Sequence, residues 1–188
     1  MPLPEKVINA LIFAEQVHKG QKRKGKDIPA MTHLSAVLMS VMGVSMNQDL
    51  WAAAPLHDTV EDCKPYGSVT IKDIAEQFGA EVARIVADVT EADKTLPWAT
   101  RKQQAVEHIA DMSEDSLILK AADVLHNLSE LLEDLERDGE GVFEMFNRDK
   151  SLTIGQFVRV VNALKERWPE NPLLPKLEEK LNNLLLWL

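Results

Sequence analysis

The sequence predicts a single all-α domain of about eight to nine helices, spanning residues 1–188. Apolar residues recur at spacings of three and four almost throughout the chain, as in amphipathic helices. No segment shows the sustained apolar–polar alternation, bounded by turn residues, that indicates hairpin strands. A long linker or low-complexity stretch is also missing, and 188 residues of 45% hydrophobic content can bury one core.

Helix start and stop residues divide this pattern into elements. Val7, Leu11, Ala14 and His18 line one face of a first helix that ends near Gly20. At that helix end an imidazole can bond free carbonyls, so His18 is expected to be structural. A lysine-rich loop follows, and eight further helices are expected after it. They run from Thr32 as N-cap to Val41, from Asn47 or Gln48 to His57, from Thr70 to Phe78, from Val82 to Val89, from Pro97 to Ile109, from Ser113 or Ser116 to Asp138-Gly139, from Phe143 to Trp168 and from Leu173 to Leu188.

The last helix carries an apolar stripe at helical spacing. Its members are Leu174, Leu177, Leu181, Leu184 and Leu188. We expect this stripe to pack against the core, with a face for a homo-oligomer as the alternative.

Charge and composition restrict the partners and the compartment. The chain has 30 acidic and 21 basic residues, and a net charge of -9 argues against nucleic-acid binding, which needs a basic surface. The apolar runs are too short for a membrane span, so no membrane partner is expected. A single cysteine, Cys63, excludes an intramolecular disulfide and fits the cytoplasm.

A local basic cluster could still attract an anionic small molecule, because charge acts at short range. The cluster lies just ahead of His33 and consists of Lys19, Lys22, Arg23, Lys24 and Lys26. A solvated basic loop is the alternative interpretation.

The adjacent pair His57-Asp58 is the strongest chemical signal in the sequence. Glu61 lies one helical turn after His57, and Asp62 one turn after Asp58, so four chelating groups gather at one helix end. Imidazole and carboxylate suit Mn²⁺, Fe²⁺ or Zn²⁺. Asp58 and Asp123 both stand in apolar surroundings, where an unpaired carboxylate would be costly. Spacing alone leaves both a metal site and a buried polar network open.

The order His33, His57-Asp58, Asp123 on a helical chain resembles the HD superfamily of metal-dependent phosphohydrolases. More specifically, it resembles the hydrolase domain of RelA/SpoT proteins and small alarmone hydrolases of the metazoan SpoT homolog type. The stretches that carry it lie between residues 8 and 130, and include His18 to Lys24, Leu56 to Asp62, Phe78-Gly79, Val89 to Glu91, Asp93 to Pro97, Arg101-Lys102 and Lys120 to Leu128.

The resemblance implies a Mn²⁺-dependent guanosine-3′,5′-bis(diphosphate) 3′-pyrophosphohydrolase that converts (p)ppGpp to GDP or GTP and pyrophosphate. Its partner is then a guanine nucleotide. The implied roles are metal ligation by His33, His57, Asp58 and Asp123, catalysis by the acidic pair Glu61 and Asp62, and substrate binding by Arg23, Lys24 and Asn127.

Two pairs of residues depart from the family pattern, Ala30-Met31 and Ser129-Glu130. They alter the expected walls of the base pocket and leave the metal residues intact. Two alternatives therefore stay open. One is an HD phosphatase that acts on another nucleotide such as NADPH, and the other is a catalytically silent sensor that binds nucleotide.

Overall fold

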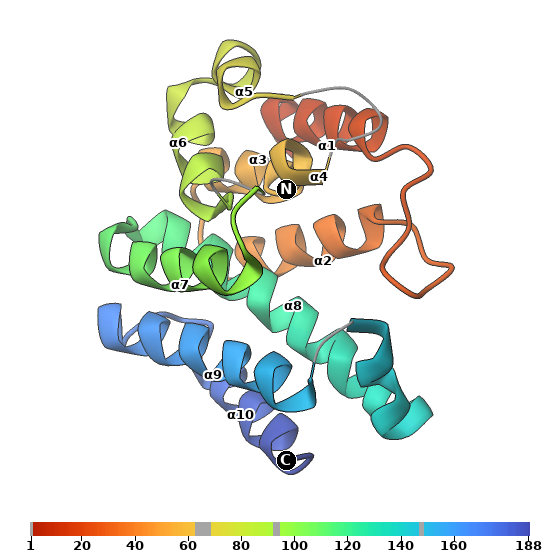
Figure 1. The fold of residues 1–188 in the computed structure, drawn as a ribbon. Helices are drawn as coiled ribbons and strands as arrows, with labels where there is room; N and C mark the ends of the chain where they lie inside the picture. The colour runs from red at the N-terminus through yellow and green to blue at the C-terminus, as the bar shows by residue number, and fades with distance from the viewer. Residues whose placement is uncertain (1, 63–68, 92–94, 147–148) are drawn as a thin grey trace. The chain divides into compact units, whose positions relative to one another are not determined.

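The all-α fold class is confirmed. The computed structural model describes residues 2–62, 69–91, 95–146 and 149–188 (Figure 1). These residues form nine α-helices of eight residues or more, a four-residue helix and two 3-10 helices, and they contain no β-strand. No helix among them is long and apolar enough to cross a membrane. The chain divides into two compact units, Met1–Lys94 and Thr95–Leu188, each of which has its own helical packing.

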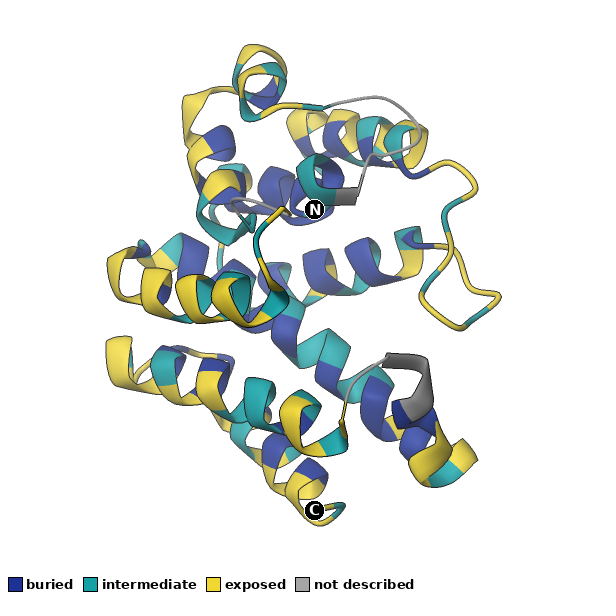
Figure 2. Ribbon diagram, viewed as in Figure 1, coloured by how far each residue is buried: buried dark blue, intermediate teal, exposed yellow. Residues whose placement is uncertain are grey.

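The first unit is built around α3. Its helices are α1 (Glu5–Val17), α2 (Met31–Met42), α3 (Gln48–Leu56), α4 (Thr59–Asp62), α5 (Ile71–Phe78) and α6 (Ala80–Val89). α3 packs against α1, α2 and α6, and every residue from Leu50 to Leu56 is buried (Figure 2). The three alanines 52–54 allow this close approach on several sides, since they carry no bulk beyond Cβ. α3 therefore presents its C-terminal end from a rigid core position.

The second unit is built around the long helix α8. It comprises α7 (Trp98–His108), η1 (Ile109–Asp111), α8 (Glu114–Asp138), η2 (Gly139–Phe146), α9 (Lys150–Arg167) and α10 (Leu174–Leu185). α10 packs on α8 and α9. Four of the five leucines in the predicted stripe are buried, and Leu188 is exposed. The expected packing face is thereby confirmed, while the homo-oligomer stays a prediction.

Several predicted helix boundaries hold for local reasons. The Asn47 side chain accepts from the backbone N–H of Asp49 at 2.9 Å and so starts α3. Ser113 accepts from the N–H of Ser116 and starts α8, which ends at Gly139 with a φ of 67°.

Two predicted boundaries were wrong. α2 begins at Met31, and the Thr32 hydroxyl donates to the Pro29 carbonyl at 2.6 Å, so Thr32 is not the N-cap. The segment from Phe143 to Trp168 is not one helix either. η2 ends at Phe146, and α9 starts afresh at Lys150 with the Asp149 carboxylate accepting from Ser151 N–H.

Candidate active site

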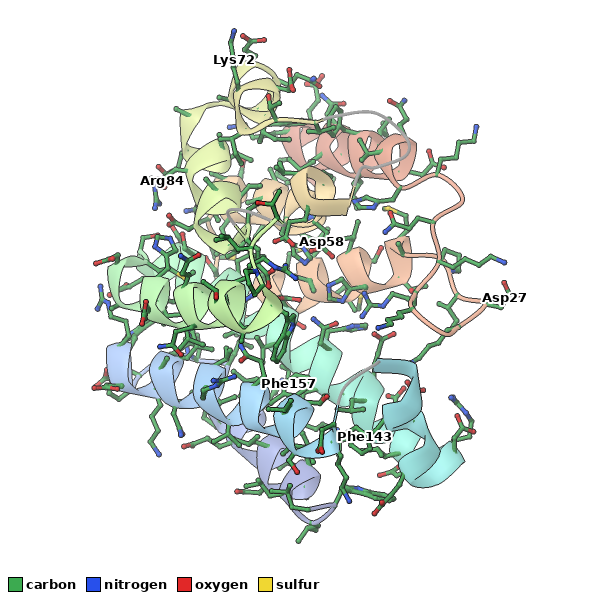
Figure 3. The ribbon with its side chains drawn as sticks, in the orientation of Figure 1. Asp27, Asp58, Lys72, Arg84, Phe143 and Phe157 are labelled. Carbon is green, nitrogen blue, oxygen red and sulfur yellow. The ribbon has the colours of Figure 1, made fainter. Side chains whose placement is uncertain are left out.

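Two histidines and one carboxylate converge inside the first unit. His33 comes from α2, His57 caps the C-terminus of α3, and Asp58 lies between α3 and α4. The two Nε2 atoms are 3.2 Å apart, and Asp58 oxygens lie 3.3 Å from His57 Nε2 and 3.7 Å from His33 Nε2. Both imidazoles are almost wholly buried, whereas Asp58 keeps 28% of its side chain exposed. In Figure 3 the Asp58 side chain lies inside the unit, between α4 and α2.

Backbone hydrogen bonds fix the orientation of the His57 ring. Nδ1 of His57 lies 2.7 Å from the Ala54 carbonyl oxygen, which can only accept. Nδ1 therefore carries the proton, and Nε2 presents its lone pair to the cluster. The Thr59 hydroxyl donates to the Leu56 carbonyl at 2.6 Å and steadies the turn that follows. A histidine that donates through its second nitrogen to a backbone carbonyl has the usual arrangement of a metal ligand.

The donor set fits a divalent cation. All three ligand atoms lie within 4.8 Å of one another. Atoms bonded to one ion at about 2.1 Å are separated by roughly 3.0–3.5 Å, which matches the spacing of the two Nε2 atoms and of His57 Nε2 and Asp58. Two imidazole nitrogens and a carboxylate suit Mn²⁺, Fe²⁺ or Zn²⁺ rather than a cation that requires oxygen ligands alone.

The fourth predicted ligand, Asp123, lies on α8 in the second unit. Its carboxylate accepts from Asn127 Nδ2 at 2.6 Å and from Lys120 Nζ at 3.2 Å. Lys120 and Asn127 belong to the same helix and lower the cost of placing this carboxylate among apolar neighbours. Metal ligation by Asp123 and substrate contact by Asn127 both stay predictions.

The predicted catalytic pair lies on the short helix α4. Glu61 Oε1 accepts a hydrogen bond of 2.6 Å from the backbone N–H of Glu91, which follows α6. This bond joins two segments thirty residues apart in sequence. The side chain of Asp62 and the whole of Cys63 lie outside the described residues. Glu61 is therefore placed by the fold, and the role of Asp62 stays a prediction.

The basic loop between α1 and α2 folds back on itself. Arg23 N–H donates to the Ile28 carbonyl at 2.8 Å, and Ala30 N–H donates to the Gln21 carbonyl at 2.9 Å. Gly25, near its tip, has a φ of 73°, which residues with a side chain rarely adopt. The loop thus has a defined conformation, while Lys19, Lys22 and Lys24 are exposed, so the solvated basic loop stays open as an alternative.

A pocket of about 190 Å³ lies beside this loop within the first unit. Its wall contains the predicted substrate residues Arg23 and Lys24 together with Asp58 of the histidine cluster. The remaining lining residues are His18, Gln21, Lys22, Ala30 and Leu34. Sequence reasoning did not place His18 or Gln21 at the site, although both lie in the stretch that carries the family resemblance. The structure thus joins the basic residues and a metal-ligand candidate in one cavity.

The sequence pattern of the HD domain matches residues 10–148, well over half of the chain. The chain belongs to the HD domain family. A similar protein is guanosine-3′,5′-bis(diphosphate) 3′-pyrophosphohydrolase MESH1 from Danio rerio, with 38% identity over 128 residues that cover 66% of this chain and 68% of the relative. The enzyme called guanosine-3′,5′-bis(diphosphate) 3′-pyrophosphohydrolase from Haemophilus influenzae is 36% identical over 126 residues, covering 64% of this chain and 18% of its own length.

A solved structure agrees with this assignment. The structure of a metazoan ortholog of SpoT that hydrolyses ppGpp superposes with a TM-score of 0.77 at 28% identity and covers 97% of both chains. The HD domain and these relatives make the chain a metal-dependent phosphohydrolase, as its sequence predicted. In this HD domain the histidine cluster supplies donors suited to the metal.

Proposed function

We propose that the protein is a Mn²⁺-dependent guanosine-3′,5′-bis(diphosphate) 3′-pyrophosphohydrolase that acts on ppGpp and pppGpp. The proposal rests on one observation, that Asp58 takes part in two groups of residues. This residue belongs both to the His33–His57 cluster and to the wall of the basic pocket. A nucleotide with several phosphates needs both, a cation for the reacting phosphate and basic side chains for the rest of its charge.

The curated relatives support the choice of substrate. Both similar proteins named above act, by their names, on guanosine-3′,5′-bis(diphosphate). The pocket chemistry agrees, since Arg23 and Lys24 offer an Arg fork and a compact ammonium to phosphate oxygens. Asn127 is a further proposed substrate contact.

The proposed reaction transfers the 3′-pyrophosphoryl group to water. The bond between the ribose 3′-oxygen and its phosphorus breaks, a bond from the water oxygen to that phosphorus forms, and GDP or GTP leaves with a proton on its 3′-oxygen. The divalent ion, when bound, supplies Lewis acidity toward the phosphate and the water. We propose that His33, His57, Asp58 and Asp123 would hold that ion.

The remaining steps fall to side chains around the ion. Glu61, fixed by the Glu91 N–H, can orient the water and accept its proton, and Asp62 is the proposed second member of this pair. Arg23 and Lys24 hold the phosphates in place while the bond breaks.

The test is a nucleotide assay on the purified protein. ppGpp should yield GDP and pyrophosphate with Mn²⁺, lose this activity with EDTA, and regain it when Mn²⁺ is restored. His57→Gln should lose both turnover and bound metal, whereas His108→Gln, on an exposed position of α7, should keep both. Phosphate release from NADPH without pyrophosphate release from ppGpp would favour the alternative phosphatase. Binding of ppGpp without turnover would favour the sensor.

Two further expectations from the sequence belong to this proposal. We place the enzyme in the cytoplasm, because a chain with one cysteine cannot form an intramolecular disulfide. We also expect a homo-oligomer as an alternative to a monomer, which light scattering of the purified protein would distinguish.

A further inference from the structure

His18 combines deep burial with an unused hydrogen-bonding atom. It caps the C-terminus of α1, and only 3% of the residue is exposed. Its Nδ1 lies 2.6 Å from the Gln21 side-chain oxygen, which accounts for one ring nitrogen. The other, Nε2, is buried and has no hydrogen-bond partner in the structure. The structural role expected from the sequence explains Nδ1 but not Nε2.

A buried nitrogen without a partner is uncommon, because it has lost its bonds to water and gained none in return. A purely structural residue at this helix end could avoid that loss by bonding a free carbonyl or by being apolar. A buried polar atom of this kind needs an explanation, and a ligand that supplies the missing partner is one.

The location of His18 agrees with a ligand-binding role. The residue lines the pocket of about 190 Å³ that also contains Arg23, Lys24 and Asp58. The pocket wall thus holds cations for phosphate groups, a carboxylate of the histidine cluster, and an imidazole that neither group uses. His18 offers a different chemistry from the cations, because a neutral imidazole can accept a hydrogen bond and Lys and Arg side chains can only donate.

The tautomer of His18 indicates what that part is. The Gln21 side-chain oxygen accepts, so Nδ1 carries the ring proton and Nε2 of the neutral ring has a lone pair. Phosphate oxygens are acceptors and cannot serve this atom. The ribose 2′-hydroxyl is a donor, and it is the group next to the 3′-oxygen at which the proposed reaction cleaves.

We propose that His18 is a substrate-positioning residue whose Nε2 accepts a hydrogen bond from the 2′-hydroxyl of the bound nucleotide. This rests on the proposed function and adds a recognition element for ribose to it. Arg23 and Lys24 hold the phosphates, while His18 orients the sugar that carries the bond to be broken.

The test compares ppGpp with its 2′-deoxy analogue in the wild type and in His18→Asn. The Asn amide can still donate to Gln21 in place of Nδ1, but nothing replaces Nε2. Loss of one neutral hydrogen bond should lower kcat/KM about five- to tenfold, whether the hydroxyl or Nε2 is removed. Removing both should cost little more than removing either, because the two groups serve one bond.

Equilibrium binding supplies a readout without turnover. The affinities of wild type and His18→Asn for each nucleotide are measured by calorimetric titration in the absence of divalent ions. The loss of affinity from removing both Nε2 and the 2′-hydroxyl should be little larger than the loss from removing either one. His108→Asn, at an exposed position on α7, is the matched control and should leave the discrimination between the two nucleotides unchanged.

Additive losses in kcat/KM and in binding would overturn the inference, because a merely structural His18 would weaken both nucleotides by the same factor. Equal kcat/KM values of the wild type for the two nucleotides would overturn it even if no variant folds. In either case the wild type still hydrolyses ppGpp and the proposed function stands. A wild type that neither binds nor hydrolyses ppGpp would refute both.

Discussion

Replacement of Glu61 separates two roles of one carboxylate, the observed hydrogen bond to Glu91 and the proposed proton transfer. Oε1 accepts the Glu91 N–H at 2.6 Å, and the charge makes Glu61 the proposed proton acceptor. Glu61→Gln keeps a carbonyl oxygen for the backbone bond and removes the basic group. Glu61→Ala removes both. The two variants should therefore differ in stability and agree in their loss of activity.

The magnitudes follow from the type of hydrogen bond. A bond to a charged group contributes about 1.5–3 kcal/mol, and a neutral bond is roughly half as strong. Glu61→Gln should then lose about 1 kcal/mol, which lowers Tm by about 2–4 °C for a chain of this size, and Glu61→Ala should lose about twice as much. General-base catalysis contributes about 10²- to 10⁴-fold, so both variants should lose activity on that scale.

The assays are thermal unfolding and pyrophosphate release at saturating Mn²⁺. Glu76→Gln is the matched control, since its side chain is 63% exposed on α5, and it should behave as the wild type in both assays. Turnover by Glu61→Gln at the wild-type rate would refute proton transfer by Glu61. If Glu61→Gln lowered Tm as much as Glu61→Ala does, the hydrogen bond that Glu61 accepts from the Glu91 N–H would not be the source of the stability.

Three further predictions concern the metal, the pocket and the pH dependence. Asp123→Asn should sharply lower the metal content after dialysis, measured by mass spectrometry, while the helical circular dichroism signal survives; unchanged metal would remove Asp123 from the ligand set. Arg23→Gln should raise KM for ppGpp about tenfold or more, because charge-assisted bonds to phosphate are lost. The control Arg84→Gln, on the surface of α6 (Figure 3), should leave KM unchanged. Equal KM values for the two variants would contradict the assignment of Arg23 to the substrate pocket. Hydrogen bonds from the Thr70 hydroxyl and N–H lower the pKa of Asp73, so the ionised carboxylate stabilises the fold above the ordinary carboxyl pKa of about 4, and this stabilisation is lost as the pH falls through the lower, folded-state pKa. The Tm difference between wild type and Asp73→Ala should therefore shrink from pH 7 to pH 3. A constant difference would contradict this.

Local chemistry explains which parts of the fold were predictable. Asn47, Ser113 and Gly139 mark helix ends through bonds or φ angles that lie within a few residues. Thr32 misled because its hydroxyl bonds a preceding carbonyl, an alternative that Ser and Thr always have. The break between η2 and α9 was missed because the apolar periodicity continues through Phe143, which is buried as a helix-core residue would be.

The candidate site was likewise predictable only where its residues are close in sequence. Spacing placed His57, Asp58 and Glu61 at one helix end, and it could not bring His33 to them, because that approach depends on how α2 packs on α3. The family resemblance, which carries such tertiary information, supplied His33. Neither source indicated the bond between Glu61 and the Glu91 N–H or the unpartnered Nε2 of His18, since both depend on backbone positions set by the whole unit.

The folded-back loop between α1 and α2 also has a consequence for protein engineering. Its two cross-loop bonds, from Ala30 to Gln21 and from Arg23 to Ile28, enclose the tip at Gly25. Because these bonds hold the two sides of the loop together, residues added or exchanged at the tip should not shift α2, and His33 should keep its position. Loop grafting at this tip is therefore a route to a different nucleotide preference on an unchanged metal-binding core.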